Sequence, residues 1–280
     1  MTPDPASFDG RAGEFDRRSA PPAEAAVDIA QAVDEMSRDA APGAVLDLGA
    51  GTGALGAPLA RCCAARGVVY LALDVSLGML ARFRGHLSGA QPVSRIRADA
   101  SRVWPIADGS TGAIFAARAA HLLDAGRFLE EVRRVLVPGG VLLLGAVRRS
   151  PESPRAQLRR KLHALLAEHG IRPRSARRRH GELATLVGPG DPPQTVASWT
   201  VTESLELALS AWQRPGHLIG RDVPALLRRE VLEDLHTWAL DRWTVGRYDA
   251  GHPLGETHPR PTLQTTERFE ITVVRPNPSP

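Results

Sequence analysis

The chain has 280 residues, of which 43% are hydrophobic and 24% charged, with a formal net charge of +4 at pH 7. This is the range of ordinary globular domains, and the length suffices for one elaborated domain or one domain with a smaller lobe. The mild charge does not by itself indicate a nucleic-acid partner, and no run of about 18 apolar residues predicts a membrane span.

The two cysteines, Cys62 and Cys63, are adjacent in the sequence. Neighbouring cysteines form a poor structural disulfide and lack the spacing of a metal site. Residues 1–10 carry prolines and acids instead of a basic stretch followed by an apolar run, which argues against a secretory signal. We therefore expect a reducing, cytoplasmic environment.

The N-terminal part, residues 1–41, begins with a polar segment and continues with an apolar periodicity that predicts a helix over 23–36. Apolar runs and amphipathic stretches then alternate. Strands are expected at 44–48, 68–73, 93–98, 111–117 and 141–147, and helices at 55–65, 77–87 and 125–136. This alternation predicts right-handed βαβ units and a parallel sheet covered on both faces. Residues 42–148 are therefore expected to form a doubly wound α/β core.

The pattern changes after residue 148. The remaining elements are expected to be helices at 155–169, 203–213 and 223–242, a further helix ending at 187, and strands at 195–200 and 265–274. The segment 265–274 alternates between apolar and polar residues, which predicts a closing edge strand followed by a tail to residue 280.

A glycine-rich turn follows the strand expected at 44–48. Gly51, Gly53 and Gly56 form a GxGxxG pattern between a strand and a helix, where glycines let the backbone approach a ligand. Because the pattern alone also suits a dinucleotide, it does not identify the ligand.

Acidic residues at the ends of three successive strands narrow the choice. Asp47 precedes the glycine turn, where a carboxylate would attract a cationic amino group and repel a pyrophosphate. Asp74 can accept hydrogen bonds from both ribose hydroxyls, and Asp99 can accept one from an adenine amino group. These acids predict a pocket for a cationic nucleoside without phosphates.

Residues 45–53 resemble motif I of the class I S-adenosylmethionine-dependent methyltransferases. Further segments resemble the family's later motifs in the same order, namely 72–80, 98–100, 104–115 and 137–142. The likeness covers residues 42–147 and indicates the small-molecule, ubiquinone-biosynthesis-like group (methyltransferase type 11). Two departures are Gly112, where an aspartate is usual in the family, and the segment 118–121.

The resemblance implies a Rossmann-like, mostly parallel seven-stranded sheet that binds S-adenosylmethionine and releases S-adenosylhomocysteine. The residues expected to bind the cofactor are Asp47, Gly49, Ala50, Gly51, Gly53, Asp74, Val75, Met79, Asp99, Ala100 and Arg118. The implied reaction is an in-line attack by the acceptor on the sulfonium methyl group, for which the protein mainly supplies proximity and alignment. A hydroxyl acceptor would need a general base, for which His121 is the candidate, with packing as its alternative role.

The resemblance also implies an N-terminal cap in residues 1–41, because Phe8 and Phe15 head segments similar to the cap of small-molecule members. Residues 149–264 are expected to hold the remaining core elements and a helical lid over the acceptor. The tryptophans of this region either line an apolar pocket or pack in an ordinary core: Trp199, Trp212, Trp238 and Trp243. The expected acceptor is a small, partly apolar molecule that is methylated on oxygen or carbon.

An RNA methyltransferase is one alternative, because the arginine run from Arg172 to Arg179 could bind RNA phosphates. No RNA-binding module accompanies the run, and a solvated helix face also explains it, so nucleic acid is not expected as a partner.

A non-catalytic protein that binds the same cofactor is a further alternative, because it would keep the same acids. A nicotinamide dehydrogenase is disfavoured, because Tyr70 and Tyr248 are the only tyrosines and the only lysine, Lys161, is remote from both. No metal is predicted, since the spacing of His252, Glu256 and His258 matches no metal-binding signature.

Overall fold

The computed structural model of the protein describes residues 20–87, 93–172, 191–213, 217–218, 221–244 and 261–276. Several features predicted above lie outside these residues. They are the segments headed by Phe8 and Phe15, residues 173–179 of the arginine run, the helix ending at 187, and the set His252, Glu256 and His258.

The chain divides into two compact units. Unit 1 comprises residues 1–148, 176–199 and 268–280, and unit 2 comprises residues 149–175 and 200–267. Three of the boundaries between the units fall within long strands, at 148/149, 199/200 and 267/268, so these strands belong in part to each unit.

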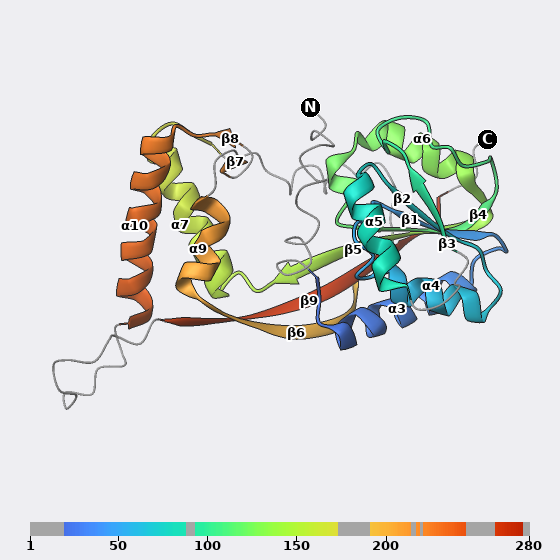
Figure 1. Ribbon diagram of the computed structural model, residues 1–280, viewed down its shortest axis with the longest axis horizontal. Helices are drawn as coiled ribbons and strands as arrows, with labels where there is room; N and C mark the ends of the chain where they lie inside the picture. Colours follow the sequence, from blue (N-terminus) through green and yellow to red (C-terminus); the bar gives the residue numbers. More distant parts are fainter. Residues whose placement is uncertain are drawn as a thin grey trace. The chain divides into compact units, whose positions relative to one another are not determined.

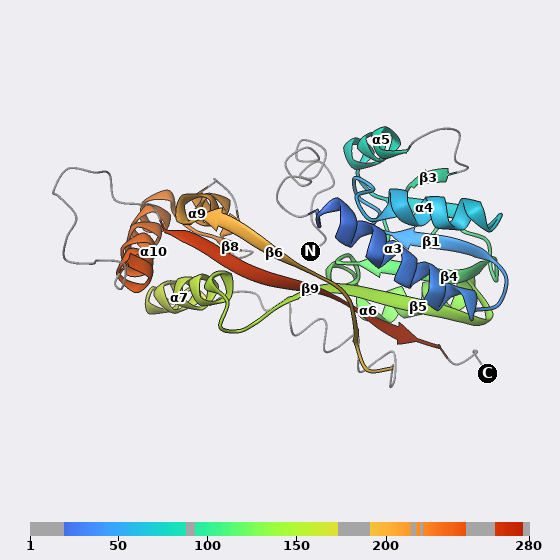
Figure 2. The same cartoon turned by 90° about the horizontal axis from the view of Figure 1, so that it is seen from below.

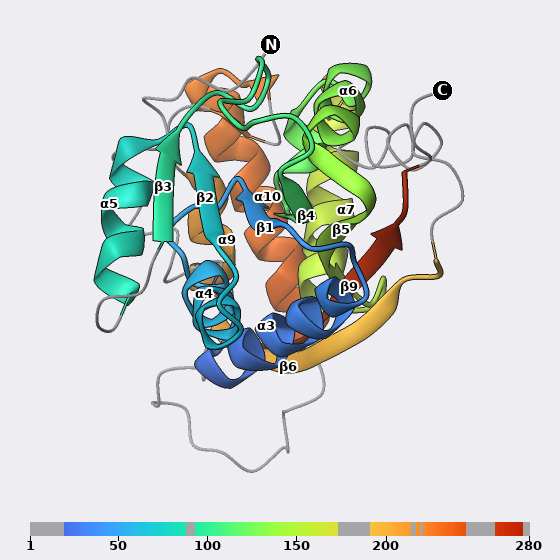
Figure 3. The same ribbon diagram turned by 90° about the vertical axis from the view of Figure 1, so that its right-hand side faces the viewer.

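A seven-stranded sheet forms the centre of the fold, in the order β3-β2-β1-β4-β5-β9-β6 (Figure 1). Its strands are β1 (Ala44–Leu48), β2 (Tyr70–Asp74), β3 (Val93–Arg97), β4 (Thr111–Ala117), β5 (Leu136–Arg149), β6 (Gln194–Ser204) and β9 (Thr262–Val274). The first five strands pair in parallel and lie side by side in Figure 3. The predicted Rossmann-like seven-stranded sheet is confirmed.

The prediction that the last strand closes the edge of the sheet is wrong. β9 lies between β5 and β6, so β6 is the edge strand (Figure 2). The N–H of Leu205, just after β6, donates to the carbonyl of Pro261, just before β9, which is the arrangement of antiparallel neighbours. The alternation in 265–274 reports which face of the sheet each side chain occupies and carries no information about pairing at the strand's edges.

Helices cover both faces of the sheet in unit 1. The helices are α3 (Ala23–Arg38), α4 (Gly56–Ala65), α5 (Leu77–His86) and α6 (Ala125–Val135), with a short 3₁₀ turn, η1 (Ala120–Leu122), before α6. Figure 1 shows α3 and α4 on one side of the strands and α6 on the other. The Oγ of Ser76 accepts from the N–H of Met79 and caps α5, and Asp124 caps α6 in the same way.

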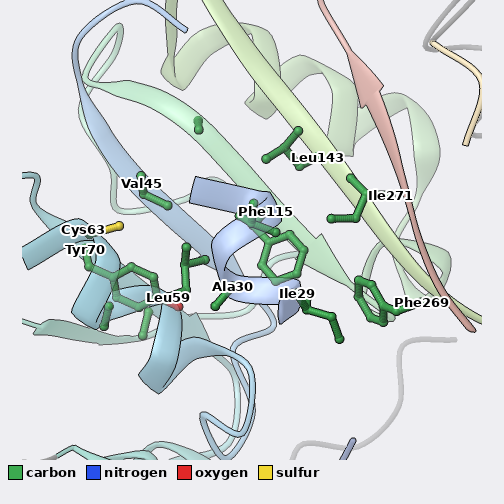
Figure 4. Close-up of a cluster of buried hydrophobic side chains, with 14 of the residues drawn as sticks. Ile29, Ala30, Val45, Leu59, Cys63, Tyr70, Phe115, Leu143, Phe269 and Ile271 are labelled. Atoms are coloured by element: carbon green, nitrogen blue, oxygen red, sulfur yellow. The ribbon is translucent and has the colours of Figure 1, made fainter. Parts of the chain in front are cut away.

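The side chains of each strand alternate between two separate cores. Val45 packs with α3, α4 and α5, whereas Leu46 packs with α6 on the opposite face. Figure 4 shows the first core, in which Ile29 of α3 and Leu59 of α4 lie near Phe115 of β4. Continuous apolar runs in the sequence therefore correspond to strands buried on both faces.

Gly112, where the family usually has an aspartate, is the second residue of β4. It packs against the backbone of residues 41–43, just before β1. A Cβ atom at Gly112 would stand 2.5 Å from the carbonyl oxygen of Ala41, and one at Gly43 would stand 2.4 Å from the Gly112 nitrogen. A side chain would therefore displace the backbone that enters β1, so glycine is required here by packing.

Unit 2 has its own apolar core. The helices of unit 2 are α7 (Pro154–Glu168), α9 (Leu205–Gln213) and α10 (Ala225–Thr244), and its two short strands, β7 (His217–Leu218) and β8 (Arg221–Asp222), pair with each other. Three tryptophans pack against this core: Trp212, Trp238 and Trp243. Trp199 packs against the core of unit 1. Of the two roles considered for these residues, core packing is the one the structure shows.

Candidate functional site

The turn after β1 is bent by three glycines with left-handed backbone angles. The φ values of Gly49, Gly51 and Gly53 are 73°, 58° and 84°, which other residues adopt only at a cost. The N–H groups of Gly49 and Ala50 both donate to the carbonyl of Leu73, at 2.8 and 3.1 Å. The turn is thereby tied to the end of the neighbouring strand β2.

Asp74 at the end of β2 holds this turn directly. Its Oδ2 accepts a 2.8 Å hydrogen bond from the N–H of Gly51, and its Oδ1 accepts a 2.9 Å bond from the N–H of Ser76. These two bonds fix the carboxylate of Asp74 between the glycine turn and the start of α5.

Asp47 at the end of β1 is buried, with only 3% of its surface exposed. Its Oδ2 accepts a 2.6 Å hydrogen bond from the hydroxyl of Tyr70. Burial raises the pKa of Asp47 to about 7; the Tyr70 hydrogen bond opposes this rise and the nearby charge of Asp74 adds to it. The carboxylate is therefore poised to change charge near neutral pH.

Asp99, after β3, is held in a turn of its own. Its Oδ1 accepts from both the N–H and the hydroxyl of Ser101, at 2.9 and 2.7 Å, and Arg102 lies 3.5 Å from Oδ2. The Ser101 hydroxyl contributes most to lowering the pKa of Asp99, so this residue carries a negative charge at neutral pH.

These strand ends surround a cavity of about 310 Å³. All of the residues expected to bind the cofactor line it, except Gly53. Gly53 lies beneath the turn, where a Cβ atom would stand 2.6 Å from the ring of Phe83. The lack of a side chain at Gly53 therefore leaves room for the Phe83 ring beneath the turn.

The cavity has further lining residues that were not among those predicted to bind the cofactor. The additional lining residues are mostly apolar: Ala20, Pro21, Leu48, Thr52, Ala54, Leu55, Leu73, Phe115, Ala117, Ala119, Leu122 and Leu123. Those after β4 follow the predicted strand directly, and this position at the carboxyl edge of the sheet was the available signal. Ala20 and Pro21 precede α3, and only the cap resemblance pointed to that region.

Arg118 and His121 both follow β4 but differ in position. Arg118 lines the cavity in a left-handed conformation, with φ of 58°, and its N–H donates to the carbonyl of Gly145. His121 lies in η1 and does not line this cavity, although the adjacent Leu122 does. A role for His121 as general base stays a prediction.

Among the described residues, no group of three or more histidine, cysteine or acidic side chains is placed to hold a metal ion. In the same part of the chain, no helix has the length and apolar character needed to cross a membrane.

A family model described as a methyltransferase domain matches residues 46–144. This stretch is a class I S-adenosylmethionine-dependent methyltransferase domain. The family predicted from the motifs is confirmed, and S-adenosylmethionine is its cofactor.

Curated relatives match the chain in this methyltransferase domain. The chain is 38% identical over 108 residues to the malonyl-(acyl-carrier protein) O-methyltransferase of Methylococcus capsulatus, covering 36% of each. It is 38% identical over 103 residues to the demethylmenaquinone methyltransferase of Clavibacter sepedonicus, covering 36% of this chain and 39% of that one. The matches therefore span little more than a third of the length of these relatives.

A solved structure shares the fold over a longer stretch. The solved structure is that of an Anaeromyxobacter dehalogenans protein described as a type II methyltransferase. The alignment covers 89% of the present chain and 97% of the Anaeromyxobacter chain, with a TM-score of 0.54 and 21% identity. At this identity the likeness concerns the fold alone.

Proposed function

We propose that this protein is an S-adenosylmethionine-dependent methyltransferase that transfers a methyl group to the oxygen or carbon of a small-molecule acceptor. The observation that carries the proposal is the meeting of Asp47, Asp74 and Asp99 around one cavity, beside a glycine turn. Three carboxylates favour a positively charged adenosyl ligand and disfavour the pyrophosphate of a dinucleotide.

The lining residues fit the separate parts of this cofactor. Asp74 would accept from the ribose hydroxyls and Asp99 from the adenine amino group, while Asp47 would face the cationic amino acid part. Val75, Met79 and Ala100 would pack against the adenine. The cavity of about 310 Å³ is within the usual range of small-molecule sites.

The bound cofactor would supply a methyl group already activated by its sulfonium, so the chain's task is to align the acceptor and exclude water. Phe115, Leu122 and Leu123 give the cavity an apolar wall that would exclude water beside the acceptor. Arg118 adds a positive charge at the same edge, where it would bind a carboxylate of the cofactor.

The class of acceptor is supported by the apolar wall and by the names of the relatives. One relative is named for malonyl-(acyl-carrier protein) and the other for demethylmenaquinone. A small, partly apolar acceptor fits the wall described above.

The proposal is tested by calorimetric binding of S-adenosylmethionine followed by methyl transfer to a panel of hydroxyl, carboxyl and activated-carbon acceptors. Saturable binding with turnover is expected. Binding without turnover on any acceptor would favour the non-catalytic protein. Salt-sensitive RNA binding that is lost when Arg177, Arg178 and Arg179 are neutralised together would favour the RNA methyltransferase.

A further inference from the structure

Tyr70, the first residue of β2, lies beneath the glycine turn with its hydroxyl on Asp47. The residue is 1% exposed, and its hydroxyl donates a 2.6 Å hydrogen bond to Oδ2 of Asp47. Its ring contacts that of Phe83, with 6.3 Å between the ring centroids. The tyrosine is therefore held on both sides, by packing at the ring and by a short bond at the oxygen.

Glycine provides the space in which this pair fits. A Cβ atom at Gly56 would stand 2.7 Å from the Tyr70 hydroxyl and 2.8 Å from Oδ2 of Asp47. At Gly53 the same atom would overlap the ring of Phe83. Two glycines of the GxGxxG pattern thus make room for buried side chains of this protein, in addition to shaping the turn.

The hydrogen bond has an electrostatic consequence for the cavity. Asp47 lines the cavity and is buried near a second carboxylate, that of Asp74. Burial and the negative charge of Asp74 both favour the protonated form of Asp47. The hydroxyl of Tyr70 opposes them, because it donates to the ionised carboxylate and so stabilises the charge.

We propose that Tyr70 is a positioning residue for cofactor binding, whose hydroxyl orients Asp47 and favours its ionised form toward a cationic ligand. This inference rests on the proposed function, since it assigns a purpose to Asp47 in that site. It adds a residue that none of the methyltransferase motifs named above includes.

Few groups can disturb the titration of Asp47. Among the described residues, the groups that act on its carboxylate are Tyr70 and Asp74, and Cys63 of α4 acts on Tyr70. Burial raises the pKa of Tyr70 well above its ordinary value and raises the pKa of Cys63 to about 12. Both stay protonated across the neutral range. Because the α-amino group of S-adenosylmethionine itself loses its proton at about pH 8, the part of the binding profile that reports on Asp47 is the part that Tyr70→Phe changes.

The test is the affinity for S-adenosylmethionine, measured by calorimetry from about pH 5.5 to 9 in buffers of different ionisation heat. For the wild type we expect affinity to rise from about pH 5.5 toward neutrality, with release of a proton on binding at the acid side, and to fall again as the α-amino group of the ligand deprotonates at about pH 8. In Tyr70→Phe the acid-side midpoint should move up by about one pH unit, so that the loss of affinity relative to the wild type is largest at acid pH and falls to within about threefold at the alkaline end. Tyr248→Phe removes the only other phenol hydroxyl and should leave the midpoint unchanged.

Equal weakening of Tyr70→Phe at every pH, or an unchanged profile, would overturn the inference and reduce Tyr70 to a packing residue. Circular dichroism checks that this variant folds. If it does not, 3-fluorotyrosine is incorporated in the Tyr248→Phe background. Its more acidic hydroxyl donates a stronger hydrogen bond to Asp47 and should lower the acid-side midpoint, whereas an unchanged midpoint would contradict the inference. A wild type that binds no S-adenosylmethionine at any pH would instead refute the proposed function.

Discussion

The backbone N–H of Gly51 donates a 2.8 Å hydrogen bond to Oδ2 of Asp74. This bond joins the glycine turn after β1 to the end of β2, so two motifs 23 residues apart become one structure. The carboxylate thereby has a folding role as well as a place in the cavity wall. Substitutions in this region are expected to separate these two roles.

Replacing Asp74 by alanine should weaken S-adenosylmethionine binding by well over tenfold, because a charged acceptor is worth roughly 1.5–3 kcal/mol per hydrogen bond. The same change removes a partner of the Gly51 N–H, so thermal stability should also fall. Calorimetry measures the affinity, and Asp241→Ala, on an exposed position of α10, is the control. Affinity that matches the control would contradict the ribose-binding role.

Replacing Gly56 by alanine should destabilise the fold by about 1–3 kcal/mol, because the new methyl group would overlap the Tyr70–Asp47 pair. Gly85 offers a matched control within α5, since a Cβ there would meet nothing within 4 Å. Gly85→Ala should stabilise the protein by about 0.5–1 kcal/mol, as helical alanine does. Denaturant unfolding of both variants tests this contrast, and equal effects would show that the packing beneath the turn is not as tight as described.

The stability of the ligand-free protein should depend on pH through Asp47. Its pKa is raised from 3.8 to about 7 on folding, so the folded state holds a proton that the unfolded state releases. This contribution is fully present below about pH 4 and is lost as the pH rises through 7. The difference in unfolding free energy between wild type and Asp47→Asn should therefore change by up to about 4 kcal/mol across that window. Parallel pH curves for the two proteins would show that Asp47 titrates normally.

Replacing His121 by alanine should lower methyl transfer to a hydroxyl acceptor more than it lowers cofactor affinity, if this histidine acts as the base. His169→Ala, at an exposed position after α7, serves as the control. Because His121 is not one of the residues that line the cavity, only a specific loss of turnover would assign it a role in the reaction. Turnover equal to that of the control would remove it from the mechanism and leave packing as its role.

The predicted strands and strand-end acids came from patterns that are local in the sequence. β1 and β4 have the predicted bounds, because continuous apolar runs ending at a turn or an acid mark buried parallel strands. The parallel sheet then brings Asp47, Asp74 and Asp99 to one edge, as the order of the motifs predicted. This part of the site follows from topology alone.

The role of Tyr70 could not be predicted in this way. In the parallel register of β1 and β2, Asp47 stands opposite Ala72, so Tyr70, two residues earlier, points to the same face. Its contact with Asp47 depends on that register and on the space left by Gly56. The position of β9 inside the sheet was missed for a related reason, since alternation identifies faces and leaves neighbours undefined.

The most direct test is a single titration experiment on the purified full chain with S-adenosylmethionine, S-adenosylhomocysteine and a nicotinamide dinucleotide. We predict saturable binding of the two adenosyl ligands, reduced in Asp74→Ala, and no binding of the dinucleotide. Binding of the dinucleotide with no response to either adenosyl ligand would contradict the assignment of this cavity to a cationic nucleoside.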